Sequence, residues 1–147
     1  MKKPIILFLF ALLSGLLFSC NSDSSDKETN TDLLIGKWIP TQTGTIVESG
    51  KESLQDIPNP GKCDTGLFEY LSDGTFTSLR YEFQDNKCVS YNKKGTWSLK
   101  DKTLNANFDD GPITLEILEL NKSTLKLKQS MQFGEIPIVL ISVYSRK

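Results

Sequence analysis

The chain has few side chains able to carry out acid–base, nucleophilic or metal chemistry, and histidine is absent from all 147 residues. Without histidine there is no Ser-His-Asp triad, no Cys-His dyad and no zinc site built on imidazole. A pair of carboxylates, as in glycosidases, is the remaining option. The acidic residues considered for it are Glu69, Asp73, Glu82, Asp85, Asp109 and Asp110. No spacing singles out two of them, so the sequence predicts no catalytic residue and no enzyme.

A second set of oxygen-bearing side chains has the spacing of four ligand positions in an EF-hand calcium loop: Asn105, Asn107, Asp109 and Glu116. The sixth position of such a loop requires glycine for its sharp turn. Asp110 stands there instead, and Gly111 comes one place late. Apolar and polar residues alternate over 104–108, which is typical of a strand rather than a calcium loop. The sequence therefore predicts no metal site and no cofactor.

The N-terminus has the composition of an export signal. Lys2 and Lys3 precede an apolar run, 5–17, that is short for a membrane-spanning helix. The run ends at Leu17-Phe18-Ser19-Cys20, which resembles the lipobox of bacterial lipoproteins, where the cysteine is acylated and becomes the new N-terminus. The resemblance implies a signal peptide over 1–19 and an acyl anchor, such as palmitate, on Cys20. Ordinary cleavage without lipidation is the alternative.

By the same resemblance, Asn21 after the cysteine implies an outer-membrane lipoprotein, facing the periplasm or the cell surface. Residues 21–32 contain no apolar side chain, so residues 20–32 are expected to form the lipidated cysteine and a disordered tether. Residues 33–147 then form one domain of ordinary size, which we expect to be monomeric. The net charge is −1 without a basic cluster, which argues against a nucleic-acid partner.

With one cysteine assigned to lipidation, Cys63 and Cys88 remain. In an oxidising compartment an isolated pair usually forms a disulfide. Such a bond would close a loop of about 26 residues and contribute about 3.5 kcal/mol on the chain-entropy formula. Two buried free thiols or a redox-active thiol are the alternatives, and the wide spacing argues against a CxxC-type redox site.

The secondary structure that would position the candidate residues consists of short runs in which apolar and polar residues alternate, separated by turn residues. No segment has a convincing amphipathic helical pattern. The predicted strands are 36–42, 66–71, 75–83, 95–99, 103–108, 113–120, 123–131 and 137–145. Residues 43–62 are expected to form a long irregular connection, in which 52–56 is a candidate for a short helix, and residues 84–94 are expected to form a polar loop. A bulge is expected near Ile117, where the apolar parity switches, and the last strand is apolar on both faces.

Eight consecutive antiparallel strands favour an all-β, up-and-down barrel, because closure removes exposed edges. A two-sheet β-sandwich is the alternative, since periodicity does not separate the two folds.

The order of several motifs resembles the lipocalin-like domains of bacterial lipoproteins. Gly36-Lys37-Trp38 has the Gly-x-Trp pattern that opens the first lipocalin strand, and Gly95-Thr96-Trp97 follows Cys63, an Asp73-Gly74 turn and Cys88. The resemblance covers most of residues 34–147. It implies that Trp38 closes the barrel floor and stacks on an arginine from the last strand, for which Arg146 is the candidate.

The barrel interior is the candidate site, because lipocalins bind small apolar ligands there. By strand parity the inward residues, which are candidate ligand-binding or core positions, are Phe68, Tyr70, Phe76, Trp97, Leu104, Ala106, Phe108, Leu115, Leu125, Leu127 and Met131. An open cavity predicts a binding module for a small apolar or amphipathic ligand. A barrel filled by its own side chains predicts a structural or protein-interaction module of the cell envelope.

Overall fold

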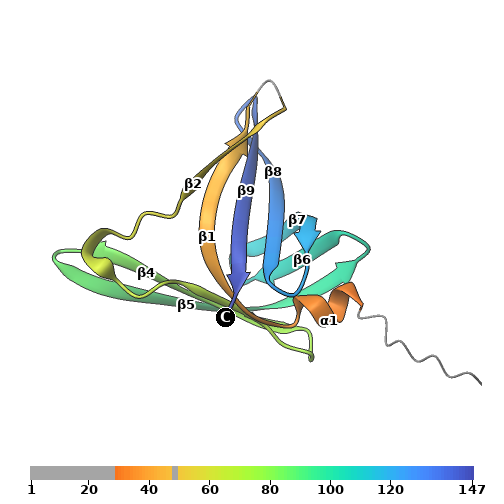
Figure 1. The fold of residues 1–147 in the computed structure, drawn as a ribbon, viewed down its shortest axis with the longest axis horizontal. Coiled ribbons are helices and arrows are strands. Elements are labelled where there is room, and N and C mark those ends of the chain that lie inside the picture. Colours follow the sequence, from red (N-terminus) through yellow and green to blue (C-terminus); the bar gives the residue numbers. More distant parts are fainter. Residues whose placement is uncertain (1–28, 48–49) are drawn as a thin grey trace, which may run out of the picture.

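The computed structural model describes residues 29–47 and 50–147. Over this range it contains a helix, α1 (Asn30–Leu34), a 3₁₀ turn (Pro60–Lys62) and the strands β1 (Gly36–Ile46), β2 (Glu52–Asp56), β3 (Leu67–Tyr70), β4 (Thr75–Gln84), β5 (Lys87–Lys100), β6 (Thr103–Phe108), β7 (Gly111–Leu120), β8 (Thr124–Phe133) and β9 (Ile136–Arg146) (Figure 1). The predicted signal peptide, Cys20 and most of the predicted tether lie outside the described residues. None of the described helical segments is long and apolar enough to cross a bilayer.

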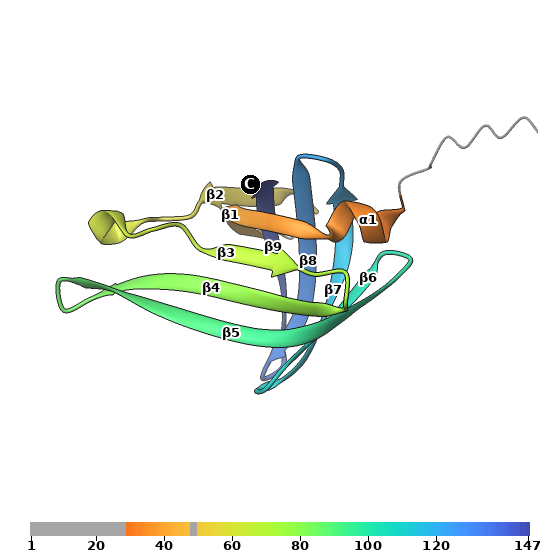
Figure 2. The same ribbon diagram turned by 90° about the horizontal axis from the view of Figure 1, so that it is seen from below.

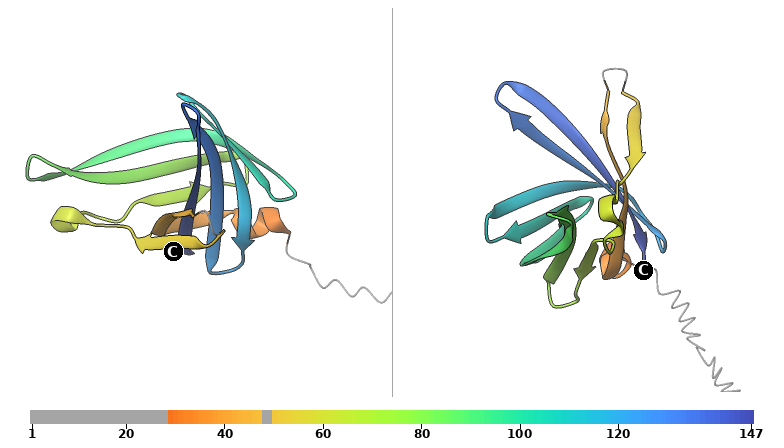
Figure 3. Two further views of the ribbon diagram at one scale, coloured as in Figure 1. Left: turned by 90° about the horizontal axis from the view of Figure 1, so that it is seen from above. Right: turned by 90° about the vertical axis from the view of Figure 1, so that its left-hand side faces the viewer.

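Eight strands close into an antiparallel up-and-down barrel. β3 to β9 follow one another as neighbours, β1 pairs with β3 on one side, and β1 pairs with β9 to close the ring. The curved wall is visible from three further directions (Figures 2 and 3). The barrel predicted from the sequence is therefore confirmed, and the sandwich alternative is wrong.

The alternation of apolar and polar residues along the strands places the apolar side chains in the core, as predicted. On β6 the inward Leu104 and Ala106 are buried, Asn105 between them is half-buried, and Thr103 and Asn107 on either side are exposed. A register shift between Ile117 and Glu119 on β7 confirms the predicted bulge, which lets the apolar residues change parity without leaving the core.

Two segments predicted to be irregular are strands. Residues 52–56 do not form a helix; they form β2, an additional strand that pairs with the far half of β1. Residues 87–94, expected in a loop, belong to β5, which pairs with β4 along a hairpin that extends beyond the barrel wall. Neither segment carries a clear alternating apolar pattern, because backbone pairing with one neighbour stabilises it without burying one face.

β2 also explains why β9 is apolar on both faces. Glu52 of β2 forms an ion pair with Lys126 of β8. A Cβ atom on Gly44 of β1, which pairs with Ile141, would meet the backbone of Ser53, so β2 lies against this face of the barrel. Ile141 of β9 is fully buried although it does not belong to the main core cluster. The outer face of β9 is therefore partly covered, as the last predicted strand required.

The predicted disordered tether ends earlier than expected. Thr29 caps α1 through a capping box with Asp32, in which each side chain bonds to the other's backbone N–H. Leu34, at the end of the helix, is fully buried in the core. Residues 30–32 are thus helical rather than disordered, because local capping and one apolar anchor order a segment that is otherwise polar.

Candidate functional site

The floor of the barrel is built around Trp38, which is fully buried. Its Nε1–H donates to the Leu34 carbonyl oxygen at 2.8 Å, and the Arg146 guanidinium lies over its ring, 4.4 Å from the centroid. Arg146 also donates to the carbonyl oxygens of Leu33 and Ile35. The arginine at the end of the last strand thus ties α1 and Trp38 together, which is the arrangement that the resemblance implied.

Gly36 explains the small first residue of the Gly-x-Trp pattern. Its backbone has a φ of 131°, and a Cβ atom there would lie 2.6 Å from a guanidinium nitrogen of Arg146. Only glycine combines that backbone conformation with so close an approach. The motif is therefore a steric requirement of the closed end of the barrel.

Above this floor lies a group of aromatic rings in edge contact. Tyr70 packs against Trp97 and Phe76 with centroid distances of 5.8 and 5.9 Å, and Phe76 meets Phe108 at 4.7 Å. Phe68 meets Tyr144 edge-on at 5.4 Å. All of these rings except Trp97 line an interior cavity of about 180 Å³. The core fills most of the barrel but leaves a small, largely apolar space.

The residues predicted to face inward divide into three groups. Those that line the interior cavity are Phe68, Tyr70, Phe76, Ala106, Phe108, Leu115 and Leu127. Trp97, Leu104 and Leu125 are buried core residues that do not line it. The prediction for Met131 is wrong, because this side chain is 38% exposed. It lies past Lys128, the last residue of β8 that pairs with β7, where the β8–β9 hairpin leaves the barrel.

Strand parity missed four residues that line the interior cavity: Ile113, Gln129, Ser142 and Tyr144. Gln129 has the same parity as the inward residues Leu125 and Leu127, and Ile113 has the same parity as Leu115. Strand alternation could therefore have predicted that both side chains point inward. Ser142 and Tyr144 could not be predicted in this way. β9 is apolar on both faces, so its sequence does not alternate and does not show which residues point inward.

A second cavity, of about 250 Å³, forms the mouth of the barrel. It shares Phe68, Phe108 and Ile113 with the interior cavity, so the two spaces adjoin. Polar side chains enter at its rim, where Lys93 pairs with Asp110 at 2.5 Å and Arg80 lies over the Tyr91 ring. The mouth is amphipathic, with an aromatic wall and charged groups of both signs.

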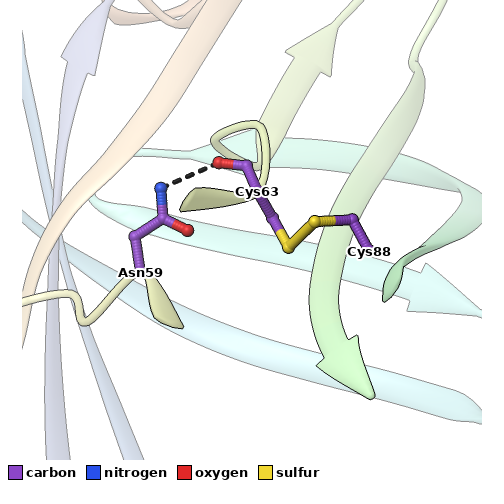
Figure 4. Close-up of a disulfide and its surroundings, with 3 residues drawn as sticks. All are labelled: Asn59, Cys63 and Cys88. Carbon is purple, nitrogen blue, oxygen red and sulfur yellow. Dashed lines mark hydrogen bonds between the residues drawn. A yellow bond between two sulfur atoms is a disulfide. The ribbon is translucent and has the colours of Figure 1, made fainter. Parts of the chain in front are cut away.

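The disulfide predicted for the two remaining cysteines is present, so this prediction is confirmed. Cys63 and Cys88 are joined, with their Cα atoms 5.6 Å apart (Figure 4). The bond ties the connection between β2 and β3 to the outer part of the β4–β5 hairpin. It lies outside the barrel core, so it shapes the periphery of the molecule.

Four of the six carboxylates considered for catalysis have structural partners. Glu82 pairs with Arg80 at 2.8 Å and Glu69 with Lys37 at 3.6 Å, while Asp73 accepts a bond from the Thr75 backbone N–H. Lys93 holds the pKa of Asp110 below its usual range. These interactions are those of surface ion pairs and turns, and no two of these carboxylates line the interior cavity or the mouth together.

The four residues with EF-hand spacing do not converge either. Asn105 accepts a bond from the Thr114 hydroxyl, and Glu116 pairs with Lys128 at 2.8 Å. Glu116 lies opposite Thr103, at the far end of the β6–β7 hairpin from Asp109. Over 29–47 and 50–147, no three metal-ligating acidic or cysteine side chains are grouped.

Two buried tyrosines give the cavity a pH-dependent stability. Burial raises the pKa of Tyr70, with a smaller contribution from Tyr144, and burial likewise raises that of Tyr144 despite its bond to Ser142. A phenol whose pKa is raised in the folded state stabilises the fold below the unfolded pKa of about 10, and this stabilisation is lost as the pH rises further.

We therefore expect the free energy of unfolding to fall above about pH 10. Urea unfolding on either side of that pH, with ultraviolet absorbance to follow tyrosinate, measures it. Tyr70→Phe should reduce the alkaline loss, because it removes one of the two groups. Ionisation of Tyr70 and Tyr144 near the ordinary value in a still-folded protein would contradict the expectation.

Comparison with known proteins gives one family and one fold. The sequence model of a family described as lipocalin-like domain matches residues 34–127. A lipocalin-like protein from Bacteroides uniformis superposes with a TM-score of 0.54 and 15% identity, covering 78% of this chain and 99% of that one. An uncharacterized protein from Bacteroides eggerthii gives 0.52 and 13%, with the same coverage of 78% and 99%.

Lobster apocrustacyanin A1 is also similar, with a TM-score of 0.52, 14% identity and coverage of 83% of this chain and 65% of that one. At these identities the likeness is one of fold. No curated protein sequence matches the chain.

Proposed function

Since the chain belongs to the lipocalin-like domain family, we propose that it binds a small apolar or amphipathic ligand inside its barrel. Lipocalin-like proteins are typically binding proteins, and small hydrophobic molecules are their common ligands. The observation that carries the proposal is the aromatic-lined interior cavity and its continuation into the mouth. Burying apolar ligand surface there would contribute about 25 cal/mol per Å².

Size limits the ligand. Ligand sites usually have volumes of about 300–1,000 Å³, and the interior cavity alone, at about 180 Å³, is smaller. The ligand would therefore extend into the mouth, past Phe68 and Phe108, with its polar end among Arg80, Lys93 and Asp110. An apolar body with a polar end fits this space better than a wholly apolar molecule.

The proposal includes the location of the protein. The lipobox-like sequence at Cys20 supports an acyl anchor in the outer membrane, with the domain facing the periplasm or the cell surface. α1 leads into the closed end of the barrel, where Leu34 and Trp38 are buried, so an anchor on that side would leave the mouth accessible.

A protein-interaction role is the second candidate, and the tip of the β8–β9 hairpin favours it. Phe133 and Ile136 are 76% and 64% exposed and pair with each other beside the turn. Met131 adds a third exposed apolar side chain on the same hairpin. Exposed apolar groups gathered in this way are typical of contact surfaces.

Native mass spectrometry of the chain, purified from its host envelope without denaturation, tests the first proposal. We expect an extra mass that disappears on denaturation. Ile113→Trp, which fills the junction of interior and mouth, should abolish it, whereas Val89→Trp on the exposed hairpin should not. A clean apo mass, together with no uptake of added decanol or decanoate, would contradict ligand binding and favour the second candidate.

A further inference from the structure

The barrel wall has a gap between β1 and β4. β3 is short and pairs with β1 only from Gly36 to Trp38, while β2 pairs with β1 only from Gln42 onward. On the other side of the gap, β4 pairs with β3 no further than Leu79. In the registers of the described strands, residues 39–41 of β1 therefore face β4 with no strand between them.

A cavity of about 490 Å³ occupies this gap, and we call it the lateral cavity. Its apolar walls come from Ile39 and Pro40 of β1, from Leu79 and Tyr81 of β4, and from Ile57. Unlike the interior cavity, it lies within the range of about 300–1,000 Å³ usual for ligand sites. A mainly apolar space larger than the interior cavity is therefore in the wall of the barrel and not at its centre.

The connection between β2 and β3 completes the lateral cavity. It runs out beside the β4–β5 hairpin and returns (Figure 2), and its outgoing residues 57–59 and returning residues 64–66 both line the space. The Ile57 N–H donates to the Thr41 carbonyl oxygen at 3.0 Å, which fixes the outgoing part to β1.

The far end of the connection is held in three ways. Cys63 is bonded to Cys88 of β5, and the Asn59 side-chain amide donates to the Cys63 carbonyl oxygen at 2.8 Å (Figure 4). Gly61, at a φ of 74°, lies so close to the Phe83 ring that a Cβ atom would be 2.2 Å from it. The walls are thus set before any ligand arrives, which lowers the entropic cost of binding.

Charge restricts what the lateral cavity would take. Its charged lining residues are Arg80 and Asp64, one of each sign. Arg80 already pairs with Glu82 at 2.8 Å and lies over the Tyr91 ring. With no excess charge and mostly apolar walls, the cavity favours an uncharged molecule.

We propose that the lateral cavity is a second binding site, specific for an uncharged, largely apolar small molecule and held open by the Cys63–Cys88 disulfide. The lateral cavity adjoins the mouth, because Phe68, Ser78 and Arg80 line both, and Phe68 also lines the interior cavity. The lateral site does not depend on a ligand in the interior, so the two sites can be tested separately.

The test uses N-phenyl-1-naphthylamine, an uncharged apolar probe, added to the purified full chain, with bound copies counted by native mass spectrometry. Ile39→Trp fills the lateral cavity, and Ile113→Trp is its matched control in the interior, since both isoleucines are half-buried on strands. Ile57→Trp, at a 40% exposed position, is a second lateral variant for the case in which Ile39→Trp fails to fold.

We expect the unsubstituted protein to bind two probe molecules. Ile39→Trp and Ile57→Trp should each lose the probe in the lateral cavity, and Ile113→Trp should lose the probe in the interior. Reducing the disulfide should weaken the lateral probe by about tenfold, because its walls are no longer preorganised. Probe binding lost only in Ile113→Trp would overturn the lateral site and leave the proposed function standing. Binding lost only in the lateral variants would support the lateral site and show that this apolar probe does not occupy the interior, and no binding at all would overturn the lateral site.

Discussion

Replacing Trp38 with alanine is expected to lower the free energy of unfolding by about 3–5 kcal/mol, the usual cost of removing a buried aromatic side chain. The indole is fully buried, and its N–H satisfies the Leu34 carbonyl oxygen at the end of α1. The substitution would leave a cavity at the floor and remove the ring beneath the Arg146 guanidinium. Urea unfolding followed by circular dichroism measures the change.

Trp38→Phe is the matched control, because it keeps an aromatic ring for Arg146 and loses only the indole N–H and part of the packing. A double-mutant cycle with Arg146→Met isolates the contact between ring and guanidinium, for which we expect a coupling of about 0.5–2 kcal/mol. Additive effects of the two substitutions would show that the arginine and the ring act independently, contrary to this interpretation.

Removal of the disulfide should have the second large effect on stability. The double variant Cys63→Ala/Cys88→Ala is expected to lose about 3.5 kcal/mol, because the unfolded chain regains the freedom of a loop of about 26 residues. This corresponds to a fall in melting temperature of roughly 10–20 °C for a domain of this size. Alanine is chosen because Cys63 is buried and a serine hydroxyl there would lack a partner.

Reduction of the unsubstituted protein supplies the control. It opens the same loop but keeps both cysteine side chains, so no packing atom is removed. The reduced protein and the double variant should melt within a few degrees of one another. An unchanged melting temperature in both would show that the loop between Cys63 and Cys88 is already restricted in the unfolded state.

Several features of the fold were predictable because they depend on local alternation. The inward residues of β6 and β8, such as Leu104, Leu125 and Leu127, are buried as their parity required. The register shift after Ile117 appeared in the sequence as a switch of apolar parity. Each of these signals lies within one strand, where the period of two links side-chain chemistry directly to orientation.

Features that depend on the neighbour of a strand were not predictable in the same way. The polar stretch 87–94 is a strand only because β4 lies beside it, and Met131 is exposed only because β7 and β1 end before it. Alternation alone predicts which face a residue occupies, but it does not say whether another strand continues far enough to cover that face.

The sequence by itself determined the class of fold, the absence of histidine chemistry, the cysteine pair and most of the aromatic residues that surround the interior. The tertiary structure alone decided how much space remains inside, and it placed the lateral cavity where β2 leaves β1 and β3 begins. The volume of a cavity is the difference between the space enclosed by distant strands and the side chains that fill it. That difference depends on how residues far apart in the chain are placed, such as Pro40 and Leu79, which line the same cavity, so no local pattern encodes it.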